Sequence, residues 1–206
     1  MSDEREARIE KVNTLRAEGI DPYPTTSQRD ITAAEALAQF DTLQQDHTHI
    51  TLAGRLMQLR EMGKAAFAHI EDGSGRIQIY IKRDDVGDEA FRRLKLLDLG
   101  DIVQSTGYLF TTRTGEKTLH VERYTLLAKA LQPPPAKGEG GHLKLFDTET
   151  RYRKRYVDLI ANRDTVLPVF LTRARALAAM REFLNGRGFV EVETPILQPL
   201  YGGATA

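Results

Sequence analysis

Hydrophobic and polar residues alternate along the middle third of the chain, starting at Ile50. The stretches ITLAGRLM, AAFAHIED and RIQIYIK have the period of two that is typical of β-strands. A helical pattern covers about residues 88–97, and two more alternating stretches follow, DIVQSTGYLF and KTLHVERYTLL, joined by the turn sequence TTRTGE. Three strands, a helix and two strands is the order of the five-stranded OB-fold barrel, which we predict for residues 49–131.

The segment before the barrel has helical spacing. Ile9, Val12 and Leu15 follow each other at intervals of three, and the pattern ends at EGIDPYP, where glycine and proline break helices. Thr32 and Glu35 have the spacing of a capping box and predict a second, short helix. Residues 1–48 are therefore expected to form an N-terminal helical segment.

The segment after the barrel differs in composition. QPPPAKGEGG is typical of a linker, which we place at residues 132–145. DTETRYRKRYVDLIANR predicts one basic helix and residues 165–185 a long one, with Pro168 in its first turn; FVEVETPIL then predicts a strand. With a helical start, a barrel and this second region at residues 146–206, the fold class is α+β.

Composition narrows the function classes. The 206 residues contain no cysteine, which excludes disulfides and thiolate metal sites. The charged N-terminus is unlike a secretory signal, and no apolar run reaches the length of a membrane span, so we expect a cytoplasmic protein. The net charge is zero, but it is the sum of −5 for residues 1–49, +2 for residues 50–131 and +3 for residues 132–206. Binding of a polyanion would therefore depend on local patches of positive charge.

Strand parity places a set of side chains on the outside of the predicted barrel. If the isoleucines of RIQIYI face the core, Gln78 and Tyr80 face outward, and the neighbouring strand presents Phe67 and His69. Aromatic rings on the outer face of an OB-fold stack on unpaired bases, and an amide can bond to a base edge. Two basic residues just before this face, Arg60 and Lys64, are candidates for phosphate contacts. The alternatives are that Phe67 packs under the N-terminal helices and that His69 is a plain surface residue.

Other site patterns are absent from the sequence or weak. The chain has no phosphate-binding P-loop, no dinucleotide-binding glycine pattern and no nucleophile elbow. The carboxylates of Glu191 and Glu193 alternate with valines, as on the polar face of a strand. Nothing in the pattern completes a metal site.

Several motifs together resemble the class II lysyl-tRNA synthetases over essentially the whole chain. They are MGKAAFAHIEDGSGRIQIYI in the barrel, LLAKALQPPP at its exit, RYRKRYVDL after the linker and FLNGRGFVEVETPILQPLYGGATA at the end. The last is similar to motif 1 of class II enzymes, a long helix and a strand that ends at a Thr-Pro pair. The resemblance implies an OB-fold anticodon-binding domain followed by the start of an antiparallel α/β catalytic domain.

The resemblance also implies roles for particular residues. Phe67 matches the ring that stacks on an anticodon base, and Gln78 the amide that reads it. The family has an acidic residue on the last strand, for which Glu122 is the candidate, displaced by one position. Motif 1 implies a homodimer, and the Gly-Gly-Ala turn implies a contact with lysine. The residues concerned are Phe189, Val190, Thr194 and Pro195 for the dimer interface and Gly203 and Ala204 for lysine.

The family joins lysine to tRNA through lysyl-adenylate, using ATP and Mg²⁺. Motifs 2 and 3, which hold ATP, do not occur in these 206 residues, so we expect an N-terminal portion that keeps tRNA binding and lacks catalysis by itself. Three alternatives remain: a stand-alone tRNA-binding module, a sibling synthetase specific for aspartate or asparagine, and a general single-strand binder.

Overall fold

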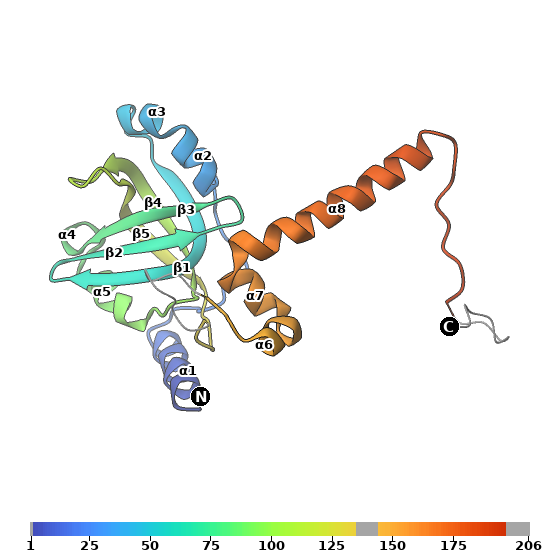
Figure 1. The fold of residues 1–206 in the computed structure, drawn as a ribbon. Coiled ribbons are helices and arrows are strands. Elements are labelled where there is room, and N and C mark those ends of the chain that lie inside the picture. Colours follow the sequence, from blue (N-terminus) through green and yellow to red (C-terminus); the bar gives the residue numbers. More distant parts are fainter. Residues whose placement is uncertain (1, 135–143, 197–206) are drawn as a thin grey trace. The chain divides into compact units, whose positions relative to one another are not determined.

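The computed structural model describes residues 2–134 and 144–196 (Figure 1). These two ranges form two compact units, residues 2–134 and residues 144–196. Each unit is described by itself below.

The first unit is built around a closed five-stranded barrel. Its strands are β1 (Ile50–Met62), β2 (Ala65–Glu71), β3 (Arg76–Lys82), β4 (Ile102–Thr111) and β5 (Lys117–Ala128), hydrogen-bonded in the order β1-β2-β3-β5-β4. All neighbouring pairs are antiparallel except β3 and β5, which run parallel. This is the predicted OB-fold, with the predicted strand order along the chain.

Side-chain alternation in the barrel is as the sequence predicts. On β2 the buried residues are Ala66, Ala68 and Ile70, and the side chains between them are half-buried. On β3 the three isoleucines are buried in the same way. The core also takes in leucines and valines of β1, β4 and β5. Because every second residue fills the barrel, the register fixes which side chains face outward.

Three helices precede the barrel. In Figure 1, α1 (Ser2–Ala17) lies at one end of the barrel, and α2 (Ala33–Ala38) and α3 (Phe40–Gln45) lie at the other. The predicted capping box at the start of α2 is confirmed, because the Thr32 side chain accepts from the Glu35 amide and Glu35 bonds back to the Thr32 amide. Ala36 and Phe40 are buried and join these helices to the core.

Buried charges attach α1 to the barrel. Arg8, only 5% exposed, donates to the carbonyls of Leu99 and Ala130, 3.1 and 2.9 Å away. The ammonium group of Lys129, which follows β5, is enclosed by the carboxylates of Asp98 and Asp101. Lys11 of α1 bonds to the first of these carboxylates at 2.6 Å. Burial alone would raise the pKa of Asp98, but the hydrogen bonds from the two lysines outweigh it and the pKa is lowered.

The connection between β3 and β4 is more broken than the predicted single helix. It consists of α4 (Arg83–Val86), α5 (Asp88–Arg93) and a 3₁₀ turn, η1 (Leu94–Leu96). Gly87 separates α4 from α5 with a φ of +86°, a conformation that helical backbone does not adopt. Leu94 is fully buried, so the connection packs against the barrel core.

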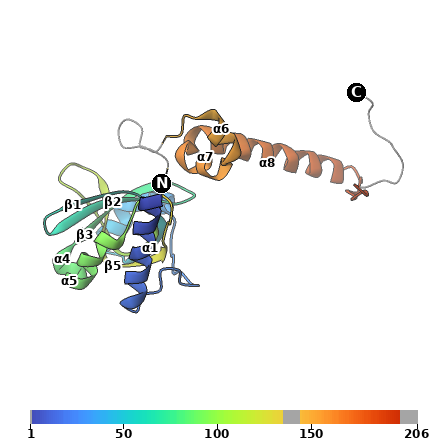
Figure 2. The ribbon, with the colours of Figure 1, turned by 90° about the horizontal axis from the view of Figure 1, so that it is seen from below.

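The second unit contains α6 (Thr148–Arg153), α7 (Arg155–Ala161) and α8 (Arg163–Asn185) (Figure 2). The single helix expected over DTETRYRKRYVDLIANR is split at Lys154, whose ψ of 58° is not helical. Asp158 is fully buried and holds the pieces together through Arg151, Arg155 and the Asn162 amide.

Two expectations for the end of this unit are wrong. Helix α8 begins at Arg163, so Pro168 lies inside the helix rather than in its first turn. Residues 189–196 do not form the predicted strand, because no described strand pairs with them and a strand needs a neighbour. The described hydrogen bonds of this stretch are with α8: the Phe189 amide donates to the carbonyl of Leu184, and Glu191 forms an ion pair with Arg181.

Candidate nucleic-acid interface

The barrel register brings four predicted outward residues together. Phe67 pairs with Tyr80 and His69 with Gln78 across β2 and β3. The two aromatic rings lie 4.9 Å apart at a tilt of 43°. We call these four residues the outer face. Phe67 is half-buried, and its described ring contact is with the neighbouring strand, not with the N-terminal helices.

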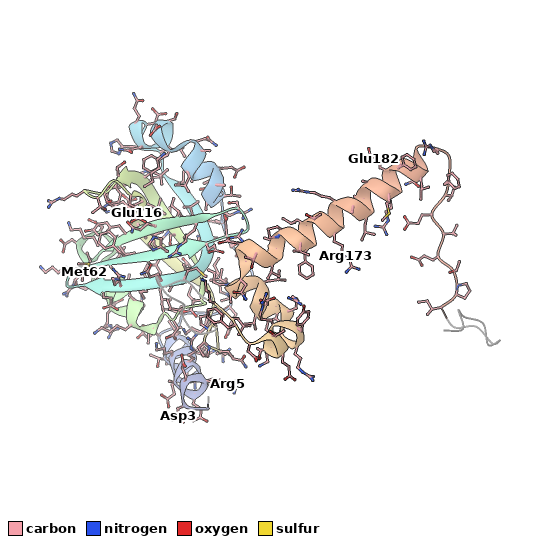
Figure 3. The ribbon with its side chains drawn as sticks, viewed as in Figure 1. Asp3, Arg5, Met62, Glu116, Arg173 and Glu182 are labelled. Atoms are coloured by element: carbon pink, nitrogen blue, oxygen red, sulfur yellow. The ribbon has the colours of Figure 1, made fainter. Side chains whose placement is uncertain are left out.

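One carboxylate joins His69 to Gln78. Glu116, labelled in Figure 3, lies where the β4–β5 hairpin enters β5. Its Oε1 is 2.9 Å from Nε2 of His69, and its Oε2 accepts a 2.7 Å hydrogen bond from Nε2 of Gln78. A carboxylate can only accept, so His69 carries a proton on Nε2 in this contact. On the other side, the Thr118 hydroxyl donates to Oε1 of Gln78 at 2.8 Å.

His69 is held in its neutral form more firmly than an exposed histidine. Burial lowers the pKa of the imidazole, and this effect exceeds the opposite effect of the hydrogen bond to Glu116. Positive charge on Arg76 and Arg60 lowers the same pKa further. Near neutral pH the ring therefore donates from Nε2 and leaves Nδ1 as an acceptor.

Aromatic side chains continue from the outer face onto β5 and β4. Tyr80 lies 5.3 Å from the ring of His120 and 5.8 Å from that of Phe110. His120 in turn stacks on Tyr108, with centroids 4.8 Å apart and an interplanar angle of 14°. Nε2 of His120 is 2.8 Å from a carboxylate oxygen of Asp85 on α4, which orients the ring. Rings of this kind give a surface on which planar groups can stack.

The two predicted basic residues border this surface. Arg60 of β1 is exposed and lies directly opposite Phe67 in the β1–β2 register. Lys64 is exposed in the turn between these strands, where Gly63 has a φ of +64°. Within the described residues neither side chain forms an ion pair, so both charges are available to phosphate oxygens.

Glu122 does not join the outer face. It sits at an irregularity in the β4–β5 register, where its carboxylate is 2.9 Å from Nε2 of His49. The acidic side chain that contacts both predicted polar residues is Glu116, which sequence reasoning missed. The sequence signal for Glu116 is its place at the end of the turn TTRTGE. A residue that follows a hairpin lying beside β3 can reach the outward side chains of β3. The alternation of KTLHV would likewise have placed Thr118 and His120 on the outward side.

The predicted sites of the second unit lie partly outside the described residues. Phe189 and Val190 are 64% and 82% exposed, and Thr194 and Pro195 are exposed as well. Gly203 and Ala204, the predicted lysine contacts, lie beyond the described residues.

Two further searches apply only to the described ranges. No group of histidine and acidic side chains there is arranged to hold a metal ion. No helix in those ranges has the length and apolar character needed to cross a bilayer.

Two family models match the chain, one for each unit. Residues 50–127 match the OB-fold nucleic acid binding domain, and residues 147–206 match the class II tRNA synthetases of the D, K and N group. The first match coincides with the barrel, from the first residue of β1 almost to the last of β5.

Whole-chain similarity is to lysine–tRNA ligases. The chain is 52% identical to that of Chloroflexus aurantiacus, over all of this chain and 41% of that protein. It is 50% identical to the ligase of Roseiflexus sp. strain RS-1 and 44% to that of Staphylococcus haemolyticus, in both cases over the whole chain and 42% of the relative. The chain thus spans about two fifths of the length of these curated relatives.

Proposed function

Because the chain belongs to the class II lysyl-tRNA synthetase family, we propose that its barrel binds the anticodon loop of a tRNA that accepts lysine. The observation that carries the proposal is the composition of the outer face. An aromatic ring, Phe67, lies one strand away from an amide, Gln78, that is held in place by hydrogen bonds. Stacking and edge recognition are the two interactions by which proteins read unpaired RNA bases.

Each component of the outer face has a role in this proposal. The ring of Phe67 stacks on one base, which favours any base because each has a π-face. The amide of Gln78 has one N–H and one lone pair left for the edge of that base. Glu116 keeps acceptor capacity after receiving its bonds from His69 and Gln78, and we propose it for a base contact in preference to Glu122. Arg60 and Lys64 contact phosphates and position the loop.

The complete ligase reaction is a proposal for the protein to which this chain corresponds. In it, lysine would be joined to tRNA through lysyl-adenylate, with ATP and Mg²⁺. Three described carboxylates at the start of the second unit are already engaged: Asp147 caps α6, Asp158 pairs with arginines and Glu149 pairs with Arg153. These three carboxylates therefore do not fit an ATP–magnesium site, and no other group of histidine and acidic side chains in the described ranges is arranged to hold a metal ion. We propose that the 206 residues alone bind tRNA and do not activate lysine.

Two of the alternatives can be weighed. The second family model covers synthetases of the D, K and N group, but each of the relatives described above is named a lysine–tRNA ligase, which favours lysine over aspartate and asparagine. A stand-alone tRNA-binding module has one observation in its favour. The barrel has its own buried core, made entirely of residues of the first unit.

We further propose that the second unit mediates homodimerisation. Helix α8 and the residues after it expose large apolar side chains along their length, a pattern that usually marks a protein interface. They include Phe170, Leu171, Leu177, Met180, Phe183, Leu184, Phe189, Val190 and Ile196. Sedimentation equilibrium of the purified chain tests this proposal, and a monomer over the micromolar range would contradict it.

The main proposal is tested by binding to a labelled anticodon stem-loop. Fluorescence anisotropy should give saturable binding to a stem-loop with the lysine anticodon, and weaker binding when its anticodon bases are replaced. Lysine-dependent exchange of pyrophosphate into ATP should be absent from the same preparation.

Equal affinity for the replaced stem-loop would contradict anticodon reading and favour a general single-strand binder. Exchange activity would contradict the proposal that these residues do not activate lysine.

A further inference from the structure

The amide of Gln78 is held from both sides by residues of the β4–β5 hairpin and of β5. Its Nε2 donates to Glu116 at 2.7 Å, and its Oε1 accepts from the hydroxyl of Thr118 at 2.8 Å. Thr118 lies beside Gln78 in the parallel β3–β5 register and is completely buried, although its position in the strand is an outward one. The Thr118 hydroxyl is therefore shielded from water.

Hydrogen-bond chemistry determines which way this amide points. A carboxylate has no proton to give, so the end of Gln78 that faces Glu116 must be the NH₂ group. The carbonyl end then faces Thr118, whose hydroxyl must supply the proton. The same hydroxyl lies 3.1 Å from the Glu116 carbonyl, but its single proton cannot serve both acceptors fully.

We propose that Thr118 is a positioning residue that, together with Glu116, holds the Gln78 amide in one orientation and thereby sets the base preference of the outer face. The inference rests on the proposed anticodon binding. Thr118 is itself buried and does not touch the base. It acts by holding Oε1, so that the remaining N–H and the remaining lone pair of Gln78 meet a base stacked on Phe67 in one fixed order.

A fixed order is what allows an amide to discriminate between pyrimidines. The edge of uracil presents an N–H between two carbonyl oxygens, whereas cytosine presents an unprotonated nitrogen next to an amino group. An amide that can turn over by 180° offers a donor and an acceptor in either order and can pair with both edges. An amide held by Glu116 and Thr118 offers its donor and its acceptor in one order only. It therefore pairs with the edge of one pyrimidine, and with the other pyrimidine polar groups of the amide and of the base stay unpaired.

The experiment compares Thr118→Val with Thr118→Ser in the complete chain. Valine has nearly the shape of threonine but no hydroxyl, whereas serine keeps the hydroxyl and loses a methyl group. Affinities are measured for a panel of anticodon stem-loops with uracil or cytosine at each anticodon position, and Gln78→Ala identifies the position that this amide reads. At that position we expect the pyrimidine preference to fall about fivefold or more in Thr118→Val and to change less than about twofold in Thr118→Ser.

A second measurement does not depend on RNA. The side-chain NH₂ of Gln78 gives two proton signals in a ¹⁵N-correlated NMR spectrum, and the proton that is hydrogen-bonded to Glu116 is shifted away from its position in a free amide. Thr118→Val should move this signal toward the free position and speed its exchange with water, and Thr118→Ser should not. If the valine variant does not fold, Thr118→Ala serves in its place.

The outcomes separate the inference from the function on which it rests. A folded Thr118→Val protein with unchanged preference and unchanged Gln78 signals would overturn the positioning role. If the unaltered chain binds no stem-loop, the proposed function fails, and the NMR comparison still decides whether Thr118 holds the amide.

Discussion

Phe67 is the residue at which a binding role and a packing role can be told apart. Its ring is half-buried against Tyr80, while Ala66 and Ala68 on either side fill the core. Truncation to alanine therefore removes a stacking surface and leaves the barrel interior intact. We expect Phe67→Ala to weaken stem-loop binding by about 1–3 kcal/mol and to leave the urea midpoint nearly unchanged, as measured by anisotropy and urea titration.

Phe91 provides the matched control. It is also half-buried, but it lies on α5 and packs against the core of the barrel. Phe91→Ala should lower the free energy of unfolding with little effect on binding. The reverse result for Phe67→Ala, lower stability with unchanged affinity, would assign its ring to packing.

Gly107 is required for steric reasons where β4 and β5 change register. A Cβ built on it would lie 1.8 Å from the carbonyl oxygen of His120, a backbone atom that cannot move without shifting β5. We expect Gly107→Ala to destabilise the chain by about 1–3 kcal/mol or more, measured by urea unfolding.

Gly73→Ala is the control for Gly107, because an added Cβ there meets no atom within 4 Å and the φ of Gly73 is not positive. Equal stability of the two variants would contradict the steric explanation.

Helix α1 depends on Arg8 for its attachment to the barrel. Its guanidinium satisfies two carbonyls from segments far apart in sequence, those of Leu99 and Ala130. Arg8→Met keeps most of the apolar stem and leaves both carbonyls without this donor, which should cost about 1–3 kcal/mol of unfolding free energy. Arg5→Met on the same helix, at an exposed position labelled in Figure 3, should cost almost nothing. A similar midpoint for both variants in urea would rule out this attachment.

Secondary structure was predictable from the sequence wherever burial imposes a period on it. The strands of the barrel follow from isoleucines and alanines at every second position, because one face of each strand must be buried. Breaks inside helices could not be predicted from the sequence. Lys154 interrupts the segment predicted as one basic helix, and the helix predicted at about residues 88–97 changes to a 3₁₀ turn at Leu94. The buried Asp158, which joins α6 to α7, is a contact that residue spacing does not show.

The same limit applies to the outer face. Parity identified Phe67, His69, Gln78 and Tyr80, because each depends only on local alternation. Glu116 could not be assigned from alternation, since it belongs to a hairpin whose approach to β3 is a property of barrel closure. Glu122 was chosen on resemblance, and the register irregularity near it directs it to His49 instead.

Over the whole molecule, a net charge of zero means that binding of a polyanion must come from local charge. The proposed phosphate contacts are Arg60 and Lys64, both exposed beside the outer face. Neutralised phosphates release counterions, so the logarithm of the affinity should fall linearly with the logarithm of salt concentration. For single-stranded nucleic acid the slope is about −0.7 for each phosphate contacted.

The charge variants test this contribution directly. Arg60→Gln should weaken binding to all stem-loops alike and make the salt slope shallower by about 0.7. Phe67→Ala should weaken binding without changing the slope, because stacking releases no counterions. Arg5→Gln, an equal loss of charge on α1, is the control for a general electrostatic effect and should change neither quantity. Equal salt slopes for Arg60→Gln and the unaltered chain would exclude a phosphate contact at Arg60. Base stacking would then be judged from the affinity of Phe67→Ala alone.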